Sequence, residues 1–226
     1  MNGRRIVVGD IHGCCKSLYN LLTETIKINK NDQIYFLGDF IDRGHSSKQV
    51  VNYVIELLIK GYNVKCLLGN HEQMLLESIN NAATFSNWYK SGGKTTLDSF
   101  GIHHPIELKK KYIYFFENLF NFIELDDYIL VHGGLNFNCD NPLTDISSMC
   151  WIRNLDPKEI DIAKINNKKI IVGHTPINLK VIKESLNSNR IVLDGGCVYK
   201  NSNDNLGYLV ALDIDSMQLF TQKNIE

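Results

Sequence analysis

Short apolar runs alternate with amphipathic stretches in the first half of the chain. The apolar runs at residues 6–8, 34–37 and 64–68 have the length of buried strands. Apolar residues recur at helical spacing between and after these runs: Leu18, Leu21, Leu22 and Ile26, then Val50, Val51, Val54, Leu57 and Leu58. A third helix is expected to start near Glu72. This order predicts βαβ units, in which the strands are parallel.

The second half of the chain is rich in strand patterns. They fall at residues 128–131, 169–172, 190–193, 208–212 and 218–221, and no long helix is expected between the last three. Residues 80–125 have no strong strand pattern and predict a helical cap insertion, inside which Trp88 and Tyr89 are expected to pack. We therefore expect an α/β fold, a four-layer-type β-sandwich flanked by helices, formed by residues 1–226 as a single domain.

Composition supports one globular domain and limits its partners. The chain has 226 residues, 44% of them hydrophobic and 22% charged, which is enough apolar mass for one core. Its net charge of -1 provides no basic field, so neither nucleic acid nor an anionic membrane is an expected partner. No apolar stretch of signal-peptide length precedes the first strand pattern, which favours a cytoplasmic protein, expected to be a monomer.

The cysteines predict free thiols. Six cysteines are scattered along the chain without a CxxC pair, and Cys66 and Cys197 fall in or beside apolar strand patterns. Structural disulfides are therefore not expected. Cys14 and Cys15 are adjacent at the start of a predicted helix, where packing is the simplest role.

Metal-ligand residues and glycines follow five of the predicted strands. These groups are 9–13 (GDIHG), 38–44 (GDFIDRG), 69–72 (GNHE), 132–134 (HGG) and 173–175 (GHT). Each is a weak signal alone, but together they contain four of the seven histidines. Because loops gather at the carboxyl edge of an open α/β sheet, the five groups are expected to meet in one crevice.

The residue types in these groups indicate a pair of divalent cations. Carboxylate oxygens, imidazole nitrogens and an amide oxygen suit manganese first, with iron or zinc as alternatives, rather than a thiolate-bound structural zinc. Two such ions about 3.5–4 Å apart need a carboxylate that bridges them. Asp39, in the central group of the first three, is the candidate for this bridge.

The five groups resemble the GDxHG, GDxxDRG, GNHE, HGG and GH signatures of the calcineurin-like metallophosphoesterases. The DRG form is similar to the phosphoprotein phosphatase family of serine/threonine phosphatases. The resemblance runs from Gly9 to about Thr175, and residues 194–196 (DGG) resemble the late DTG turn of that family. The short length and residues 151–153 (WIR) look most similar to bacteriophage lambda phosphatase and its bacterial relatives.

The resemblance implies a role for each matching residue. The first metal would be bound by Asp10, His12 and Asp39, and the second by Asp39, Asn70, His132 and His174. His71 would be the general acid, paired with Asp42. Arg43 and Arg153 would bind the phosphoryl oxygens, together with Asn70. The carboxy-terminal segment of the eukaryotic members is absent from this sequence.

The implied charges favour a phosphate dianion as substrate. Two cations, two carboxylates and a hydroxide leave about +1, to which Arg43 and Arg153 add two. We therefore expect hydrolysis of phosphate monoesters by a metal-bound hydroxide, on phosphorylated serine or threonine of a protein or on a small phosphoester.

Two other functions remain open at this point. A related branch of the family with nearly the same motifs hydrolyses dinucleoside polyphosphates symmetrically, with diadenosine tetraphosphate as the example. The insertion at 80–125 would have to form a nucleotide pocket in such an enzyme and an open groove in a protein phosphatase. The other alternative, from a different class, is a catalytically silent binding scaffold. An inactive relative is expected to have lost ligands, whereas all six metal positions and His71 are present here.

Overall fold

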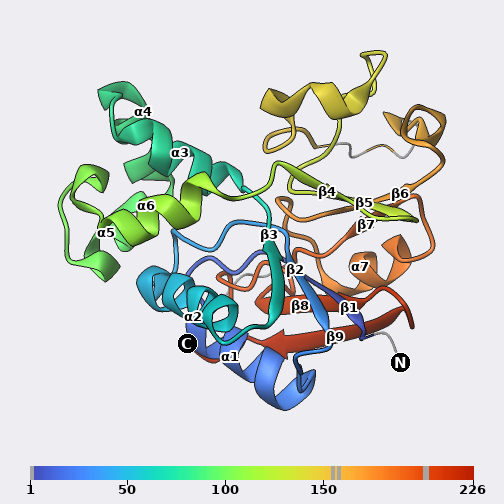
Figure 1. Ribbon diagram of the computed structural model, residues 1–226, viewed down its shortest axis with the longest axis horizontal. Coiled ribbons are helices and arrows are strands. Elements are labelled where there is room, and N and C mark those ends of the chain that lie inside the picture. Colours follow the sequence, from blue (N-terminus) through green and yellow to red (C-terminus); the bar gives the residue numbers. More distant parts are fainter. Residues whose placement is uncertain (1–2, 154–155, 157–158, 201–203) are drawn as a thin grey trace.

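Two β-sheets packed face to face form the centre of the protein in a computed structural model, which describes residues 3–153, 156, 159–200 and 204–226 (Figure 1). The first sheet has the order β3-β2-β1-β8-β9 and the second the order β4-β5-β6-β7. The strands are β1 (Arg5–Val8), β2 (Gln33–Phe36), β3 (Asn63–Cys66), β4 (Phe122–Glu124), β5 (Tyr128–Val131), β6 (Lys169–Val172), β7 (Arg190–Val192), β8 (Tyr208–Asp213) and β9 (Gln218–Lys223).

Each sheet combines parallel and antiparallel pairs. β1, β2 and β3 are mutually parallel, as the βαβ prediction requires, and β8 joins β1 in the antiparallel sense and pairs with β9. In the second sheet β5, β6 and β7 are parallel and β4 is antiparallel to β5. Each sheet therefore has three parallel strands whose carboxyl ends can carry a site.

The alternation of side chains along the strands builds three hydrophobic layers. In β1, Ile6 and Val8 face the outer helices, whereas Val7 points between the sheets. In β5, Leu130 points between the sheets and its neighbours Ile129 and Val131 face the opposite side. One core thus lies between the sheets and one on each outer face, which confirms the predicted α/β sandwich.

Helices cover the outside of this sandwich (Figure 1). The α-helices are α1 (Cys15–Asn20), α2 (Ser47–Ile59), α3 (Asn70–Ser78), α4 (Ala82–Trp88), α5 (Lys94–Phe100), α6 (Lys110–Glu117) and α7 (Leu179–Ser185). The π-helical turns are η1 (Leu21–Thr25) and η2 (Tyr89–Gly93). The 3-10 turns are η3 (Pro105–Glu107), η4 (Pro142–Thr144), η5 (Ile146–Ser148) and η7 (Ile162–Ile165).

The region predicted as a helical insertion is helical through Glu117 and then enters a strand. Helices α4, α5 and α6 pack against α2 and α3, beside the first sheet. The prediction of a helical insertion over residues 80–125 is wrong at its end, where β4 occupies Phe122–Glu124. This strand has three residues and lies at a sheet edge, so it is too short to produce a readable alternation. That the insertion acts as a cap stays a prediction.

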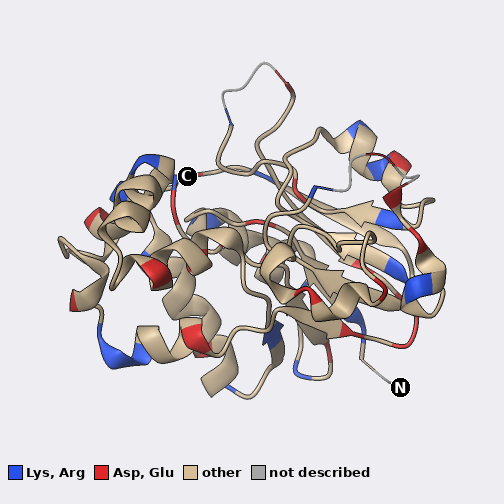
Figure 2. Ribbon diagram, turned by 90° about the horizontal axis from the view of Figure 1, so that it is seen from above, with Lys and Arg blue, Asp and Glu red and all other residues tan. Residues whose placement is uncertain are grey.

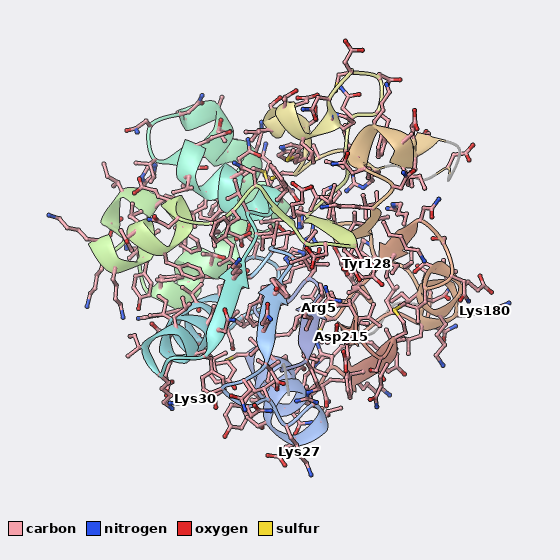
Figure 3. All side chains as sticks on the ribbon, turned by 45° about the vertical axis from the view of Figure 1, so that its right-hand side comes forward. Arg5, Lys27, Lys30, Tyr128, Lys180 and Asp215 are labelled. Atoms are coloured by element: carbon pink, nitrogen blue, oxygen red, sulfur yellow. The ribbon has the colours of Figure 1, made fainter. Side chains whose placement is uncertain are left out.

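Arg5 joins the two sheets at the end opposite the ligand-bearing loops. Its guanidinium lies 2.9 Å from Asp127 Oδ1, just before β5, and 2.7 Å from Asp215 Oδ1, in the β8–β9 turn. Figure 3 shows Arg5 and Asp215 near Tyr128 of the second sheet. Because these pairs are partly exposed, each contributes about 1 kcal/mol or less to stability.

The charged residues and the cysteines are distributed over the whole described fold. Lys and Arg are interspersed with Asp and Glu over the described ribbon (Figure 2). All six cysteines are free thiols. Within the described ranges, no helix combines the length and the apolar character needed to cross a membrane.

Candidate metal centre

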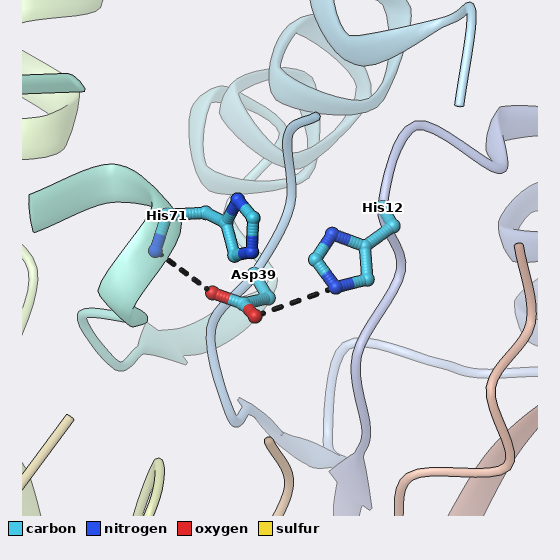
Figure 4. A group of neighbouring side chains, drawn as sticks. All are labelled: His12, Asp39 and His71. Atoms are coloured by element: carbon cyan, nitrogen blue, oxygen red, sulfur yellow. Dashed lines mark hydrogen bonds and ion pairs between the residues drawn. The ribbon is translucent and has the colours of Figure 1, made fainter. Parts of the chain in front are cut away.

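The predicted metal ligands lie together at the carboxyl ends of the parallel strands of both sheets. All are buried, namely Asp10, His12, Asp39, Asn70, His132 and His174. Two ligand groups form within the part of the chain that the structure describes, each with its donor atoms within 4.8 Å of one another. The first joins His12, Asp39 and His71 (Figure 4). The second joins Asp39, His132 and His174, so Asp39 belongs to both, as a bridging carboxylate would.

The Asp39 carboxylate stands at the centre of this arrangement. Its Oδ1 accepts a hydrogen bond from the backbone N–H of His71 at 3.2 Å. Its Oδ2 lies 3.4 Å from His12 Nε2 and 3.5 Å from His132 Nε2. Burial favours the neutral acid, but the surrounding imidazoles, His132 foremost, hold the pKa of Asp39 well below its usual range. Asp39 is therefore charged and able to act as a ligand.

The ring of His132 is oriented to bind a cation through Nε2. Its Nδ1 donates to the carbonyl oxygen of Leu37 at 2.8 Å, which fixes the ring. Nε2 faces two acceptors, Asn70 Oδ1 at 3.2 Å and the Asp39 carboxylate. Burial opposes the charged form, yet the charge of Asp39 raises the pKa of His132 to about 10. Three lone pairs thus converge on a point that requires a positive charge, either a proton or a metal cation.

Asp10 and His174 carry buried polar atoms that lack partners among the described residues. Asp10 Oδ2 accepts from the backbone N–H of His174 at 2.9 Å, whereas Asp10 Oδ1 and His174 Nε2 make no hydrogen bond. Burial raises the pKa of Asp10 well above its usual range and lowers the pKa of His174 to about 3. A buried carboxylate is costly unless a cation compensates it. These atoms fit metal ligands, although Asp10 lies outside the two groups that share Asp39.

His12 presents Nε2 to the site and Arg43 contacts the same atom. His12 Nδ1 donates to the carbonyl oxygen of Ile41 at 2.8 Å, and Arg43 Nη1 donates to His12 Nε2. A cation bound at His12 Nε2 would therefore have to displace the Arg43 guanidinium from this lone pair. The Arg43 guanidinium also lies over the ring of Tyr199, with its Cζ 5.7 Å from the ring centroid. Tyr199 was not among the predicted site residues.

His71 and Asp42 form a buried pair beside the ligand groups. His71 Nδ1 lies 2.6 Å from Asp42 Oδ2. Burial opposes protonation of His71, but the charges of Asp39 and Asp42 raise its pKa above the usual value. The ring therefore tends to keep the proton that a general acid needs.

Two residues of the helical insertion hold Asp42 in place. Trp88 Nε1 donates to Asp42 Oδ2 at 2.7 Å, and Thr96 Oγ1 donates to Asp42 Oδ1 at 2.6 Å. Trp88 is fully buried, as predicted, but it also supplies this hydrogen bond, which the sequence did not reveal. The packing predicted for Tyr89 is wrong, because 40% of its side chain is exposed. The insertion thus orients the His71–Asp42 pair in addition to packing.

Glu72 fixes the backbone around Asp39 and was also missed as a site residue. Its Oε2 accepts from the N–H groups of Asp39 and Gly69 at 2.9 and 3.1 Å. Its Oε1 accepts from Phe40 and Ile41 at 2.9 and 3.3 Å. The available signal was its place in the first turn of a helix that begins after a glycine, where a Glu accepts hydrogen bonds from backbone N–H groups. One buried carboxylate therefore shapes two of the ligand-bearing loops.

The ligand-bearing loops adopt backbone conformations that few side chains favour. A Cβ on Gly69 would lie 2.2 Å from Asp39 Oδ1, and one on Gly173 would lie 2.1 Å from Asp10 Oδ1, so only glycine fits at either position. Positive φ angles occur at His12, Asp39, Asp42, Arg43 and His174. Non-glycine residues in this region store strain that the surrounding contacts must offset, and such strain gathers at functional sites.

Arg153 lies at the border of the site and is exposed. It lines a cavity of about 410 Å³ together with Leu135, Asn136, Phe137, Asn138, Ile152 and Glu159. Its charge reaches His174, where it adds to burial in lowering the pKa. The structure therefore gives Arg153 a place near the second ligand group without a direct contact to it among the described residues.

A profile of the calcineurin-like phosphoesterases matches residues 3–216 of the chain. Among curated proteins, a symmetrical bis(5'-nucleosyl)-tetraphosphatase of Buchnera aphidicola is 41% identical over 69 residues, 30% of this chain and 24% of that protein. A protein of the same name from a Marinomonas species is 26% identical over 135 residues, 57% of this chain and 43% of that protein. The chain thus spans less than half the length of these curated relatives.

Solved structures share the fold at low sequence identity. A protein provisionally described as a diadenosine tetraphosphatase has a TM-score of 0.69 at 19% identity, over 99% of this chain and 95% of that one. A protein serine/threonine phosphatase from Saccharomyces cerevisiae has a TM-score of 0.62 at 18% identity, over 100% of this chain and 81% of that one. These likenesses concern the fold alone.

Replacing Asp39 by Asn should reduce the number of metal ions bound. Asn keeps the shape of the side chain but removes the charge that both ligand groups share. We expect the unsubstituted protein to bind two Mn²⁺ per chain and Asp39→Asn to bind one or fewer, as measured by calorimetric titration. Asp98→Asn, at an exposed position on α5, is the matched control and should still bind two. Two ions bound to Asp39→Asn would exclude Asp39 as the bridge.

Glu72→Gln should destabilise the site without removing a ligand. The amide would direct N–H groups toward backbone N–H donors, and each buried donor left unsatisfied costs about 1–3 kcal/mol. We expect a lower free energy of unfolding in urea and weaker Mn²⁺ binding. Glu77→Gln, on the exposed side of the same helix, changes an exposed hydrogen bond and is expected to alter stability by about 0.5 kcal/mol or less. Equal effects of the two substitutions would contradict the role given to Glu72.

Proposed function

Because the chain belongs to the calcineurin-like phosphoesterase family, we propose that it is a metal-dependent hydrolase of dinucleoside polyphosphates, with diadenosine tetraphosphate as the representative substrate. The observation that carries the chemistry is the pair of buried ligand groups that share Asp39, with His71 and Asp42 beside them. The phosphoprotein phosphatase assignment that the DRG motif favoured becomes the second candidate.

The preference for a nucleotide rests on two observations. The curated relatives that match this chain include several named symmetrical bis(5'-nucleosyl)-tetraphosphatases. The cavity beside Arg153 has about 410 Å³, which is within the size range of small-molecule sites. It offers apolar and amide side chains for a nucleoside, and Arg153 for a phosphate.

Different residues of this chain would have different roles around the phosphate. Asp10, His12, Asp39, Asn70, His132 and His174 would hold two divalent cations, for which manganese is our first choice. When bound, such cations lower the pKa of water and stabilise charge on phosphoryl oxygens. Arg43 and Arg153 would bind the phosphoryl oxygens and orient the group. His71, held by Asp42, would protonate the leaving oxygen.

A protein serine/threonine phosphatase is the second candidate. The residues 38–44 (GDFIDRG) provide Arg43 in the pattern of that family, and the fold is similar to that of a yeast member. The reaction centre would be the same in both cases. The two candidates differ in the leaving group, which is a nucleotide in one and a serine or threonine alkoxide in the other.

A side-by-side assay distinguishes the substrates. We expect the manganese-loaded protein to have a higher kcat/KM on diadenosine tetraphosphate than on a phosphoserine peptide or a phosphotyrosine peptide. Higher kcat/KM on the phosphoserine peptide would favour the second candidate and leave the metal centre intact. Hydrolysis of none of the three by protein that binds two ions would support the silent scaffold instead.

His71→Asn should affect substrates according to their leaving groups. General-acid catalysis contributes about 100-fold to 10,000-fold when the leaving oxygen is strongly basic. We therefore expect a loss of kcat in this range on an alkyl phosphate and a loss below about tenfold on 4-nitrophenyl phosphate, whose leaving group needs little protonation. Equal losses on both esters would remove His71 from the acid role.

A further inference from the structure

A second cavity lies along β3, away from the metal centre. It has about 530 Å³ and is bounded by α2, β3 and the segment from α6 to Phe120. Several of its apolar side chains are exposed, with 42% of Leu58, 80% of Ile59, 69% of Tyr114 and 50% of Phe120 accessible to solvent. Such a contiguous apolar surface marks an interaction site more often than isolated exposed residues do. We call this cavity the β3 groove.

The floor of the β3 groove is the edge of a sheet. β3 is the terminal strand of the first sheet and pairs with β2 on one side only (Figure 1). In this parallel ladder Leu67 donates to Phe36, so alternate residues of β3 direct their backbone groups toward β2. Val64 lies three positions before Leu67, so its N–H and C=O point away from β2 and into the groove. An unpaired edge of this kind can accept another strand.

The chain itself already pairs with this edge at one end. Phe120 N donates to Cys66 O at 2.9 Å, and Leu68 N donates to Phe120 O at 2.8 Å, which forms an isolated parallel bridge. The backbone groups of Val64 lie just before this bridge. An added strand would therefore continue a pairing that Phe120 begins.

The positive charges around the groove favour a partner that carries carboxylates. Lys65, Lys110 and Lys111 line it, and none of the described lining residues is acidic. Neither Lys65 nor Lys110 forms an ion pair with a described residue. A second copy of the chain would bring the same lysines face to face, which is unfavourable. A partner with carboxylates would pair with them.

We infer that the β3 groove binds an extended segment of a partner protein in which apolar residues alternate with Asp or Glu. The segment would pair with the backbone of Val64 as an added strand. Its apolar side chains would contact Ile59 and Tyr114, and its carboxylates would reach Lys65 and Lys110. This inference is independent of the proposed substrate, because the groove shares no lining residue with the metal centre.

A peptide of alternating Ile and Glu residues tests the inference on the whole chain. Fluorescence anisotropy of the labelled peptide should show binding that weakens as salt concentration rises. Two matched peptides, one with Lys in place of Glu and one with N-methylated amides along the pairing edge, should bind at least about tenfold more weakly. Hydrogen exchange of the Val64 amide should slow when the acidic peptide is bound.

Variants of the groove identify where the peptide binds. Ile59→Asp and Lys110→Glu change exposed side chains, and each should weaken binding by about tenfold or more. Val181→Asp and Lys180→Glu make similar changes at exposed positions of α7 and should leave binding unchanged. Figure 3 shows Lys180 at the right-hand edge of the molecule, away from β3 and α2.

Four results would overturn the inference. Absence of saturable binding by the acidic peptide would exclude the stated partner chemistry, and equal binding of the N-methylated peptide would exclude strand addition. Unchanged binding to Ile59→Asp and Lys110→Glu would place the peptide elsewhere. Sedimentation that shows a dimer dissociated by Ile59→Asp would assign the groove to a second copy of the chain.

Discussion

The buried charge of Asp39 is the constraint on which the site depends. A carboxylate removed from water is stable only when opposite charge and hydrogen-bond donors surround it. Here the imidazole of His132 provides positive charge, the N–H of His71 provides a donor, and Glu72 holds the Asp39 backbone at a positive φ angle. The same arrangement that compensates the charge also builds two ligand groups, and within each group the donor atoms lie within 4.8 Å of one another. The stability of the site and the placement of the candidate metal ligands are therefore coupled through one side chain.

The two sheets contribute unequal parts of this centre, and neither suffices alone. Loops after β1, β2 and β3 carry Asp10, His12, Asp39 and Asn70, whereas loops after β5 and β6 carry His132 and His174. The hydrogen bonds of His132 to Leu37 and of His174 to Asp10 cross from the second sheet to the first. The hydrophobic layer between the sheets therefore sets the separation of the ligand groups, because it fixes how closely these loops approach.

The two cavities for which roles are proposed lie on different parts of the fold. The cavity beside Arg153 is formed by loops that follow β5, whereas the β3 groove is formed by α2, β3 and the end of the helical insertion. The insertion also anchors Asp42 through Trp88 and Thr96. It thus connects a surface suited to a partner with the residue that orients His71, through helices packed against α2 and α3.

The sequence by itself determined most of the strands and the buried polar residues that follow them, because side-chain periodicity and the composition of turns are local properties. It missed β4, whose three residues are too few to show a period, and it gave Trp88 a packing role only. The hydrogen bonds of Trp88 and Thr96 to Asp42 join residues 46 and 54 positions apart. Such contacts, like the free edge of β3, depend on how the elements pack, and only the tertiary structure decided them. The choice between a nucleotide and a phosphoprotein also lay beyond the motifs, because the proposed reaction centre would be the same for both and the surrounding cavities arise from packing.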